Sequence, residues 1–456
     1  MPSDVDVALA RWFERANERD GALASGTVVA TLDDDDDIDE GRTRRGKRRR
    51  GLFGKTRGGG PNDVVATVSV RGGLKTTRGD DDANGAQREL ANENEEWALS
   101  VVLMRERAKG KASRYAPFVE SLYEHTPASA VAVSEDAREA LEAYSAGETI
   151  KAADADVERG WISARKTFEK FPTIFSSNFF TFEAFKEALS IVQANAFVAE
   201  HVQEANGETK TYRALVPIAH LIPHSTRSTV PCVRIENDEF VIKVDPYEEM
   251  SEMTCSHGNY SDAETFARFS SSAHYSEAAN PANMIKLAFP KADAMIEHIK
   301  HCGLASNIGI NAAGATPELM CALRLGSANA TELRKITKSP QTVQSLRTTS
   351  VSERSEIAVY DVLFATITSL LNAYPTSDAE DRLLLTSPQL KLKDDVPQAI
   401  LVRYNEKRLA VDALNKIQYQ GRKHLGHVLF DEHFSRIEGL SGGGAKNVND
   451  RRREEL

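Results

Sequence analysis

The chain has 456 residues, of which 41% are hydrophobic and 27% are charged, as in an ordinary globular protein of two or three domains. The net charge of −10 argues against a protein that coats nucleic acid, because neutralising phosphates requires a net basic face. No apolar run approaches the roughly 20 residues that a transmembrane helix needs.

The first 21 residues contain no recognisable targeting segment. They carry acids in the first turn and lack both an apolar h-region and an acid-poor stretch rich in Arg and Ser. The four cysteines form no C-x-x-C pair, so their spacing supports neither a disulfide framework nor a zinc knuckle. We expect a reducing compartment, with the cytoplasm favoured and the chloroplast and nucleus left open.

The N-terminal part combines a short helix with two strands. Apolar residues recur at helical spacing from Val7 to Arg19, whereas Gly26–Leu32 and Asp63–Thr77 have strand-like patterns. The two strands flank a charged insertion, residues 33–60. We expect them to pair as a hairpin with an expanded loop, because a longer surface loop adds little closure entropy.

The insertion contains an acidic run, Asp33–Glu40, and then Arg42–Arg50, in which seven of nine residues are basic. No EF-hand spacing supports calcium binding in the acidic run. The basic run favours a solvated loop that the neighbouring acids partly neutralise. Two functional interpretations stay open, namely recruitment of an acidic partner and a nuclear-localisation or nucleic-acid patch.

The middle of the chain is helical and then β-rich. Residues 93–122 and 157–197 have helical patterns, and the second pattern is broken at Phe171-Pro172. Ala214–Ser225 is predicted to be a buried strand that leads into a turn. Cys232–Asp245 is predicted to be a hairpin.

The C-terminal part is predicted to be helical, because strand patterns disappear after about Pro290. Ser355–Pro375 and Asn405–Gln418 carry the apolar stripes of helices. The last 16 residues, 441–456, are Gly-rich and then charged, which predicts a disordered tail.

Several segments, spread over most of the chain, together carry a resemblance to a known family. They are ARWFERANERDG, RRRGLFGKTRGGGP, ALVPIAHLIPHS, MTCSHGNYSDAETFARF, ERSEIAVYDVLFATITSLLNAYP and NEKRLAVDALNKIQ. The chain resembles the SET-domain protein methyltransferases of the Rubisco large-subunit lysine methyltransferase type, a group that also includes an actin-histidine methyltransferase.

The resemblance implies an α+β fold. A β-rich SET domain would occupy residues 1–290, with a helical insertion at about residues 88–178. An all-α domain at residues 291–440 would follow and bind a protein substrate or partner. Residues 441–456 would form the disordered tail.

In this family a methyl group passes from S-adenosylmethionine to a protein side chain, and the resemblance leaves lysine and histidine open as targets. Cofactor and acceptor enter a narrow channel from opposite sides, so most of the acceleration is positional. The acceptor must be neutral, and oxygen atoms, including a tyrosine hydroxyl, orient it. An Asn-His pair and a G-x-G turn hold the cofactor.

Carried over residue by residue, the resemblance makes His257 the catalytic candidate, in the place of the family's tyrosine. The candidate cofactor-binding residues are Arg50, Gly51, Leu52 and Phe53 in the turn, together with Asn195 and His224. Other positions depart from the family pattern. Asn195 replaces an arginine, Pro223 replaces the cofactor-binding asparagine, and Ser271 replaces an aromatic residue.

These departures leave two hypotheses open. The chain is either a protein methyltransferase that uses S-adenosylmethionine or a catalytically degraded SET scaffold that acts as a protein-interaction module. Pro223 supports the second hypothesis, because it offers a cofactor neither a side-chain amide nor an N–H. We expect no metal site, because no zinc spacing relates the candidate ligands His220, His224, His257 and Cys255.

Overall fold

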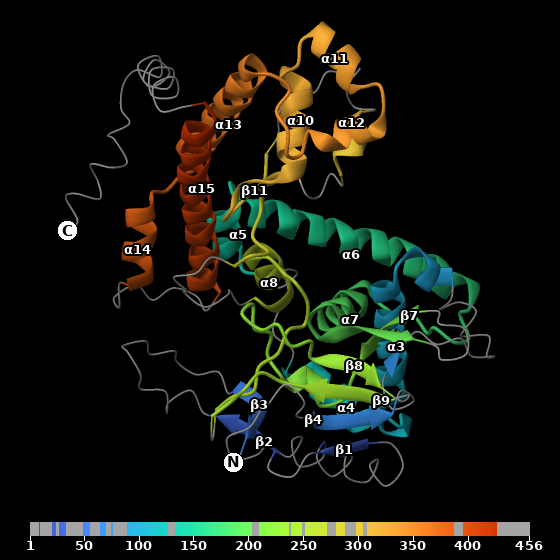
Figure 1. The fold of residues 1–456 in the computed structure, drawn as a ribbon. Coiled ribbons are helices and arrows are strands. Elements are labelled where there is room, and N and C mark those ends of the chain that lie inside the picture. Colours follow the sequence, from blue (N-terminus) through green and yellow to red (C-terminus); the bar gives the residue numbers. More distant parts are fainter. Residues whose placement is uncertain are drawn as a thin grey trace. The chain divides into compact units, whose positions relative to one another are not determined.

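The chain, seen here in a computed structural model, divides into two compact units (Figure 1). The first comprises residues 1–282 and 379–404, and the second comprises residues 283–378 and 405–456. The structure describes residues 9, 21–23, 27–32, 49–54, 64–69, 74–75, 89–125, 133–202, 209–236, 239–248, 251–270, 280–287, 298–303, 308–386 and 395–425. The acidic run, most of the basic run, nearly all of the predicted N-terminal helix and the tail lie outside these residues.

Short antiparallel sheets form the β-rich part of the first unit. The strand order β1-β4-β9-β8 is formed by Gly21–Leu23, Val64–Ser69, Glu239–Lys243 and Val233–Glu236. The strand order β5-β7-β6 is formed by Leu74–Lys75, Thr209–Leu215 and Ala196–Val202. The pairing of β8 with β9 confirms the hairpin predicted at residues 232–245.

The charged insertion is organised differently from the prediction. β2 (Thr27–Leu32) pairs with β3 (Arg49–Gly54), so the hairpin closes inside the insertion. β4, the strand predicted to be its partner, lies between β1 and β9 instead. The prediction was wrong because RRGLFG, with its charges and glycines, has a weak strand pattern, and pairing in the fold overrides that preference.

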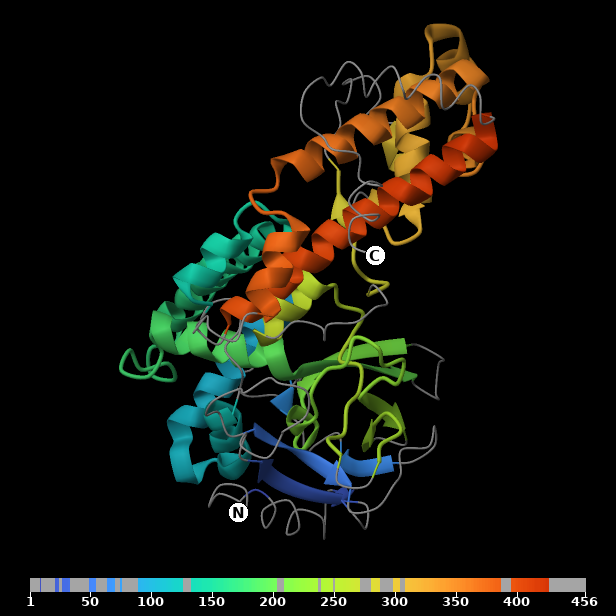
Figure 2. The same ribbon diagram turned by 90° about the vertical axis from the view of Figure 1, so that its left-hand side faces the viewer.

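The first unit also contains a group of helices, whose arrangement Figures 1 and 2 show. They are α3 (Glu95–Lys109), α4 (Ala116–His125), α5 (Glu135–Leu141), α6 (Ser145–Lys170), α7 (Phe182–Asn195), α8 (Asp262–Phe269), α14 (Asp378–Thr386) and the start of α15 (Val396–Leu425). All side chains of α3 from Trp97 to Met104 are buried, which places this helix inside the core. α6 ends directly before Phe171-Pro172, as predicted.

Two predicted elements end earlier than expected. The helix predicted to reach residue 197 stops at Asn195, where β6 begins, and the Asn195 side chain bonds back to the Ile191 carbonyl at 2.9 Å. β7 ends at Leu215, and the remainder of the predicted strand contains the 3-10 helix η3 (Ala219–Leu221). In both places the chain changes its conformation within a run of apolar residues. Apolar periodicity alone does not show such a change.

Residues 379–404 return to the first unit and complete a second core there. Val396 and Ile400 of α15 pack with Phe266 of α8 and with apolar residues of α5 and α6. The backbone N–H and the hydroxyl of Ser134 both donate to Asp395, at 2.7 and 2.8 Å. The domain boundary at residue 290 stays a prediction, but a single cut in the chain does not describe the first unit.

The second unit is mainly helical. Its helices are α10 (Pro317–Ser327), α11 (Ala330–Ile336), α12 (Pro340–Ser345), α13 (Glu353–Ala373) and the remainder of α15. It also contains a small antiparallel sheet, of order β10-β11-β12, formed by Ile285–Lys286, Gly309–Asn311 and Gly314–Ala315. The sequence did not indicate these strands because each has only two or three residues.

Helix α13 forms much of the core of the second unit. By length and composition it could cross a membrane, and it is the one helix among the described residues of which this is true. Its side chains Val359, Leu363 and Ile367 are at most 1% exposed and pack in the core with α10 and α15. One face of α13 therefore packs in the core, and 33% of its most apolar 18-residue window is buried.

All four cysteines are paired, which contradicts the expectation from their spacing. Cys232 bonds to Cys255 in the first unit, and Cys302 bonds to Cys321 in the second. The partners are 23 and 19 residues apart. No local motif joins them, and the fold alone brings each pair together.

Gly160 of α6 lies against two aromatic rings, because a Cβ at this position would be 2.8 Å from the Trp97 ring and 3.0 Å from the Phe185 ring. We expect Gly160→Val to lower the free energy of unfolding by about 1–3 kcal/mol through overpacking. Chemical denaturation followed by tryptophan fluorescence measures the change. Ala155→Val, at an exposed position of α6, should cost less than about 0.5 kcal/mol, and equal losses in both variants would contradict the packing argument.

Candidate functional site

Two extended segments of the first unit lie side by side and bring two histidines together. His224 and Cys255 form a parallel β-bridge, in which the Ser225 N–H donates to the Cys255 carbonyl at 2.9 Å. The Cys255 N–H donates in turn to the Pro223 carbonyl at 3.3 Å. As a result, His224 and His257 lie with their ring centroids 5.7 Å apart.

Hydrogen bonds define the protonation of these two rings. The backbone N–H of His257 donates to Nδ1 of His224 at 3.2 Å, so a neutral His224 carries its proton on Nε2. Burial lowers the pKa of His224 to about 4 and that of His257 to about 3. Both rings are therefore neutral at neutral pH. Nε2 of His257 lies 2.7 Å from the Ile222 carbonyl oxygen. When His257 carries its proton on Nε2, this N–H donates to that oxygen.

Aromatic rings surround the histidine pair. We call Phe197, His224, His257, Tyr260 and Phe269 the aromatic cluster. The Phe197 ring meets His257 edge-on at 4.7 Å, and the Phe269 ring stacks on His224 at 5.5 Å. Tyr260 meets His224 edge-on at 5.5 Å. The cluster thus consists of uncharged rings, whose faces attract cations.

One polar atom of the cluster has no partner among the residues that the structure describes. Nε2 of His224 is buried and makes no hydrogen bond with them. Leaving a buried donor unpaired costs about 1–3 kcal/mol. This N–H is therefore a favourable position for an acceptor atom of a ligand.

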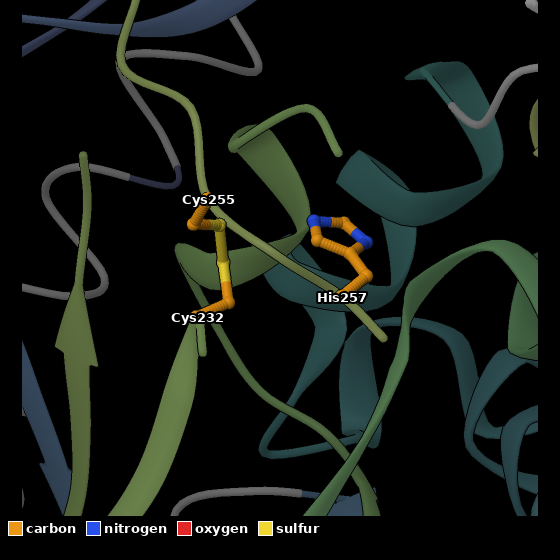
Figure 3. A group of neighbouring side chains, drawn as sticks. All are labelled: Cys232, Cys255 and His257. Carbon is orange, nitrogen blue, oxygen red and sulfur yellow. A yellow bond between two sulfur atoms is a disulfide. The ribbon is translucent and has the colours of Figure 1, made fainter. Parts of the chain in front are cut away.

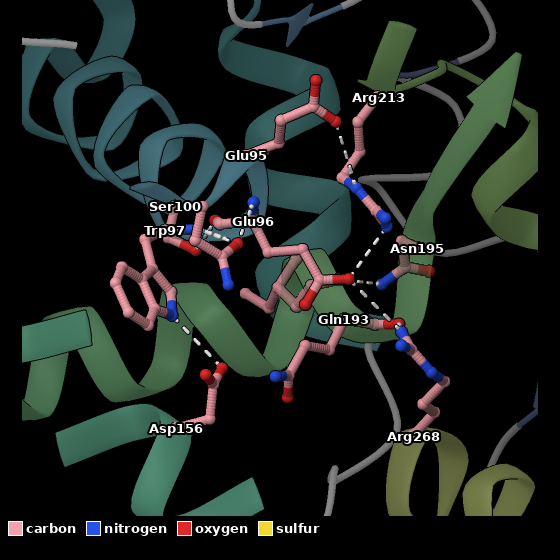
Figure 4. A network of polar contacts seen from close by, with 11 residues as sticks. Glu95, Glu96, Trp97, Ser100, Asp156, Gln193, Asn195, Arg213 and Arg268 are labelled. Carbon is pink, nitrogen blue, oxygen red and sulfur yellow. Dashed lines mark hydrogen bonds and ion pairs between the residues drawn. The ribbon is translucent and has the colours of Figure 1, made fainter. Parts of the chain in front are cut away.

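A polar network, drawn in Figure 4, reaches the aromatic cluster through the contact of Arg268 with Tyr260. The Glu96 carboxylate is 2.8 Å from Nη1 of Arg213 and 3.6 Å from Nη1 of Arg268. Arg268 also donates to the Gln193 carbonyl at 2.9 Å, and its guanidinium lies 4.7 Å from the centre of the Tyr260 ring. The network ties α3, β7 and the end of α7 to α8, which carries Phe269.

The predicted site residues fall into two groups. His224 and His257 meet directly. Asn195 lies close to them, because it follows Ala194, whose carbonyl contacts the His257 ring. The Asn195 amide N–H donates to the Ile191 carbonyl of its own helix at 2.9 Å. Residues 50–53 form part of strand β3, not a turn, and β3 lies next to η3, the segment that leads to Ile222.

Sequence reasoning missed Tyr260 and Phe269. Ser271, which replaces an aromatic residue of the family, lies outside the described residues, but Phe269 brings an aromatic ring to His224 from two positions earlier. A capping box of Ser261 and Glu264 starts α8, and this signal was present in the sequence. The cap marks only the start of the helix, so the position of Phe269 at its end had no comparable signal.

Acid should destabilise the first unit through the two histidines. Their pKa values lie below the ordinary 6.5, so the unfolded chain binds more protons than the folded one as the pH falls. The stability is complete above about pH 6.5 and is lost progressively as the pH falls through about 4 and then about 3. Urea denaturation at a series of pH values measures this decline. His257→Asn should make it shallower, and an unchanged decline would contradict the assignment.

Comparison with known proteins shows what the two units resemble. A sequence model of the Rubisco LSMT substrate-binding family matches residues 283–409, which lie in the second unit and in the segment that returns to the first. In a sequence comparison with curated proteins, no protein matches the chain.

Solved structures share the fold over the whole chain. A structure of Rubisco LSMT bound to AdoMet has a TM-score of 0.68 and 17% identity, with 100% of each chain covered. The SET domain of LSMT bound to MeLysine and AdoHcy has a TM-score of 0.70 and 18% identity, also with 100% of each chain covered. The predicted resemblance to the Rubisco LSMT type and the predicted α+β fold class are therefore confirmed.

Proposed function

We propose that this chain is a SET-domain protein methyltransferase that moves a methyl group from S-adenosylmethionine to a nitrogen of a protein side chain. The observation that carries the proposal is the meeting of His224 and His257 inside the aromatic cluster. It occurs on a fold shared with a structure of Rubisco LSMT bound to AdoMet and with LSMT structures bound to AdoHcy or sinefungin together with lysine or a methylated lysine.

The residues of the aromatic cluster fit the cofactor in two respects. S-adenosylmethionine supplies an electrophilic methyl group on a sulfonium cation, and uncharged aromatic faces favour a cation. The unpartnered Nε2–H of His224 suits an acceptor atom of the same ligand. We assign His224, Asn195 and residues 50–53 to cofactor binding, because they stand at the positions that hold the cofactor in the family, although Asn195 replaces an arginine there.

His257 is assigned to the acceptor end of the site. Its pKa of about 3 keeps the ring neutral, so the ring does not repel a basic side chain that approaches it. A lysine amine that loses water in these apolar surroundings also tends to lose its proton, which makes it nucleophilic. The bond from His257 to the Ile222 carbonyl holds the ring in one orientation, and positioning of this kind is the main source of acceleration.

The second unit is assigned to recognition of a protein partner. The family model that matches residues 283–409 is named for substrate binding in Rubisco LSMT, and the second unit contains most of the matched residues. We infer that this unit binds the protein substrate.

One observation favours the alternative of a non-catalytic scaffold. His257 carries no hydroxyl to orient an acceptor, and its Nε2–H donates to the Ile222 carbonyl instead. Pro223 likewise offers no side-chain hydrogen bond to a cofactor. In this alternative the fold and the second unit bind a protein partner without methyl transfer.

Transfer of a labelled methyl group tests the proposal. The purified chain is incubated with methyl-labelled S-adenosylmethionine and a cell lysate, and we expect label in at least one protein. His224→Phe keeps an aromatic ring but removes the N–H, and should reduce labelling by about tenfold or more. His298→Asn, which lies outside the aromatic cluster, is the matched histidine control for cofactor binding and should leave that binding unchanged. If the folded wild type labels no protein, the chain is not a methyltransferase, and the non-catalytic scaffold that binds a protein partner is the remaining function.

A further inference from the structure

Three potential metal ligands meet beside the aromatic cluster (Figure 3). The Sγ atoms of Cys232 and Cys255 and one ring nitrogen of His257 all lie within 4.8 Å of one another. The two cysteines are at most 1% exposed, and in this structure they form a disulfide. Cys232 is the ligand that sequence spacing could not associate with His257, because it lies in a separate segment of the chain, directly before β8.

Backbone hydrogen bonds hold the three residues together independently of the disulfide. The Cys232 N–H donates to the Ser256 carbonyl at 3.0 Å, and Pro231 and Ser256 form a parallel β-bridge. The Cys232 carbonyl also accepts from the Lys243 N–H at 3.0 Å. Opening the disulfide therefore leaves both thiols next to the His257 ring, with Cα atoms 5.0 Å apart in the disulfide-bonded form.

We propose that reduction of the Cys232–Cys255 disulfide creates a binding site for Zn²⁺, with two thiolates and the His257 imidazole as ligands. Two equivalents of a small-molecule thiol reduce the bond to two cysteine thiols and leave as the oxidised disulfide. Zn²⁺ then displaces one proton from each thiol. Two thiolates and one neutral imidazole form a ligand set that zinc favours, and a water molecule completes the tetrahedron.

The local geometry suits this metal. Ligand atoms of a tetrahedral zinc site lie about 3.5–3.8 Å apart, so the 4.8 Å spread closes with small side-chain rotations once the sulfurs separate. A histidine that binds a metal usually donates its other ring N–H to a carbonyl or carboxylate. His257 has two backbone carbonyls at its ring, those of Ile222 and Ala194, so one ring nitrogen can keep its proton while the other binds the metal.

The metal site and the proposed methyltransferase site would share His257. When His257 is held by zinc it is withdrawn from the acceptor end of the aromatic cluster. The thiol state of the Cys232–Cys255 pair would then control methyl transfer. This consequence rests on the proposed function, whereas metal binding itself does not.

Cobalt(II) is a suitable probe, because tetrahedral Co²⁺–thiolate sites absorb strongly. The full chain is reduced with a phosphine, desalted under nitrogen and titrated with Co²⁺ and then with Zn²⁺. We expect one equivalent of Co²⁺ to give a thiolate-to-metal band that Zn²⁺ abolishes, and the untreated, disulfide-bonded chain to give none. Cys232→Ser and His257→Ala should each weaken binding by more than about tenfold.

The second disulfide provides the matched control. The double variant Cys302→Ser/Cys321→Ser keeps the Cys232–Cys255 pair and should bind Co²⁺ like the wild type. Circular dichroism checks that each reduced variant stays folded. If the reduced wild type binds no Co²⁺, or if binding survives His257→Ala and disappears in the Cys302→Ser/Cys321→Ser variant, the proposal is wrong. Neither outcome depends on methyl transfer, so the proposed function would stand or fall separately.

Discussion

Arg324→Met is expected to lower the free energy of unfolding by about 3–5 kcal/mol, because it leaves a buried carboxylate without its partner. The side chains of Arg324 and Glu356 are only 5% and 4% exposed. Nε and Nη2 of Arg324 donate to the two carboxylate oxygens of Glu356 at 2.8 and 2.6 Å. Nη1 donates to the Leu346 carbonyl at 2.7 Å. Urea denaturation of the purified chain measures the loss.

Two variants separate the buried charge from a general effect of mutation. Arg324→Met/Glu356→Leu removes both charges and should recover most of the lost stability, since apolar side chains can replace a buried ion pair. Arg165→Met breaks a pair with Glu169 whose side chains are 64% and 65% exposed, and should cost less than about 1 kcal/mol. Equal costs for Arg324→Met and Arg165→Met would show that burial of the pair is not what matters.

His257→Tyr is expected to raise the rate of methyl transfer by about tenfold to a hundredfold, because it adds a hydroxyl to orient the acceptor nitrogen. A tyrosine ring can keep the edge-on contact with Phe197, now 4.7 Å between centroids. The effect should appear in kcat more than in KM, because the hydroxyl acts on the reacting atoms. Initial rates with methyl-labelled S-adenosylmethionine measure it.

His257→Phe is the control for His257→Tyr. It brings the same ring without the hydroxyl, so it should not increase the rate. If the tyrosine variant is no faster than the phenylalanine variant, while both stay folded and bind the cofactor, His257 does not lie at the acceptor end. The proposed roles of His224 and His257 would then need to be exchanged or abandoned.

Strong local patterns made much of the fold predictable. Helix α13 and the β8–β9 hairpin follow directly from apolar periodicity and from two short strands around a polar tip. The pairing of β2 with β3 was missed, because RRGLFG gains its strand conformation from its neighbour rather than from its own residues. The return of residues 379–404 to the first unit depends on long-range packing, which periodicity does not report.

The part of the candidate site that lies in the two signature segments was predictable from the sequence. His224 and His257 come from two signature segments, and the structure brings them together. The His257 N–H donates to Nδ1 of His224 and so leaves the proton of that ring on Nε2, a contact that the sequence does not show. The two disulfides likewise join residues that only the fold brings together. Contacts of this kind form between residues that are distant in the sequence, so spacing cannot show them.

Binding of S-adenosylmethionine to the purified, disulfide-bonded chain tests the central claim most directly, and isothermal titration calorimetry measures it. We expect one saturable site, weakened by about tenfold or more in His224→Phe and unchanged in His298→Asn. The His224 variant matters because Nε2 of that ring is the buried donor without a partner among the described residues. If the folded wild-type chain releases no heat of binding at about 1 mM cofactor, the chain is not a methyltransferase that uses S-adenosylmethionine. The non-catalytic SET scaffold would then be the function.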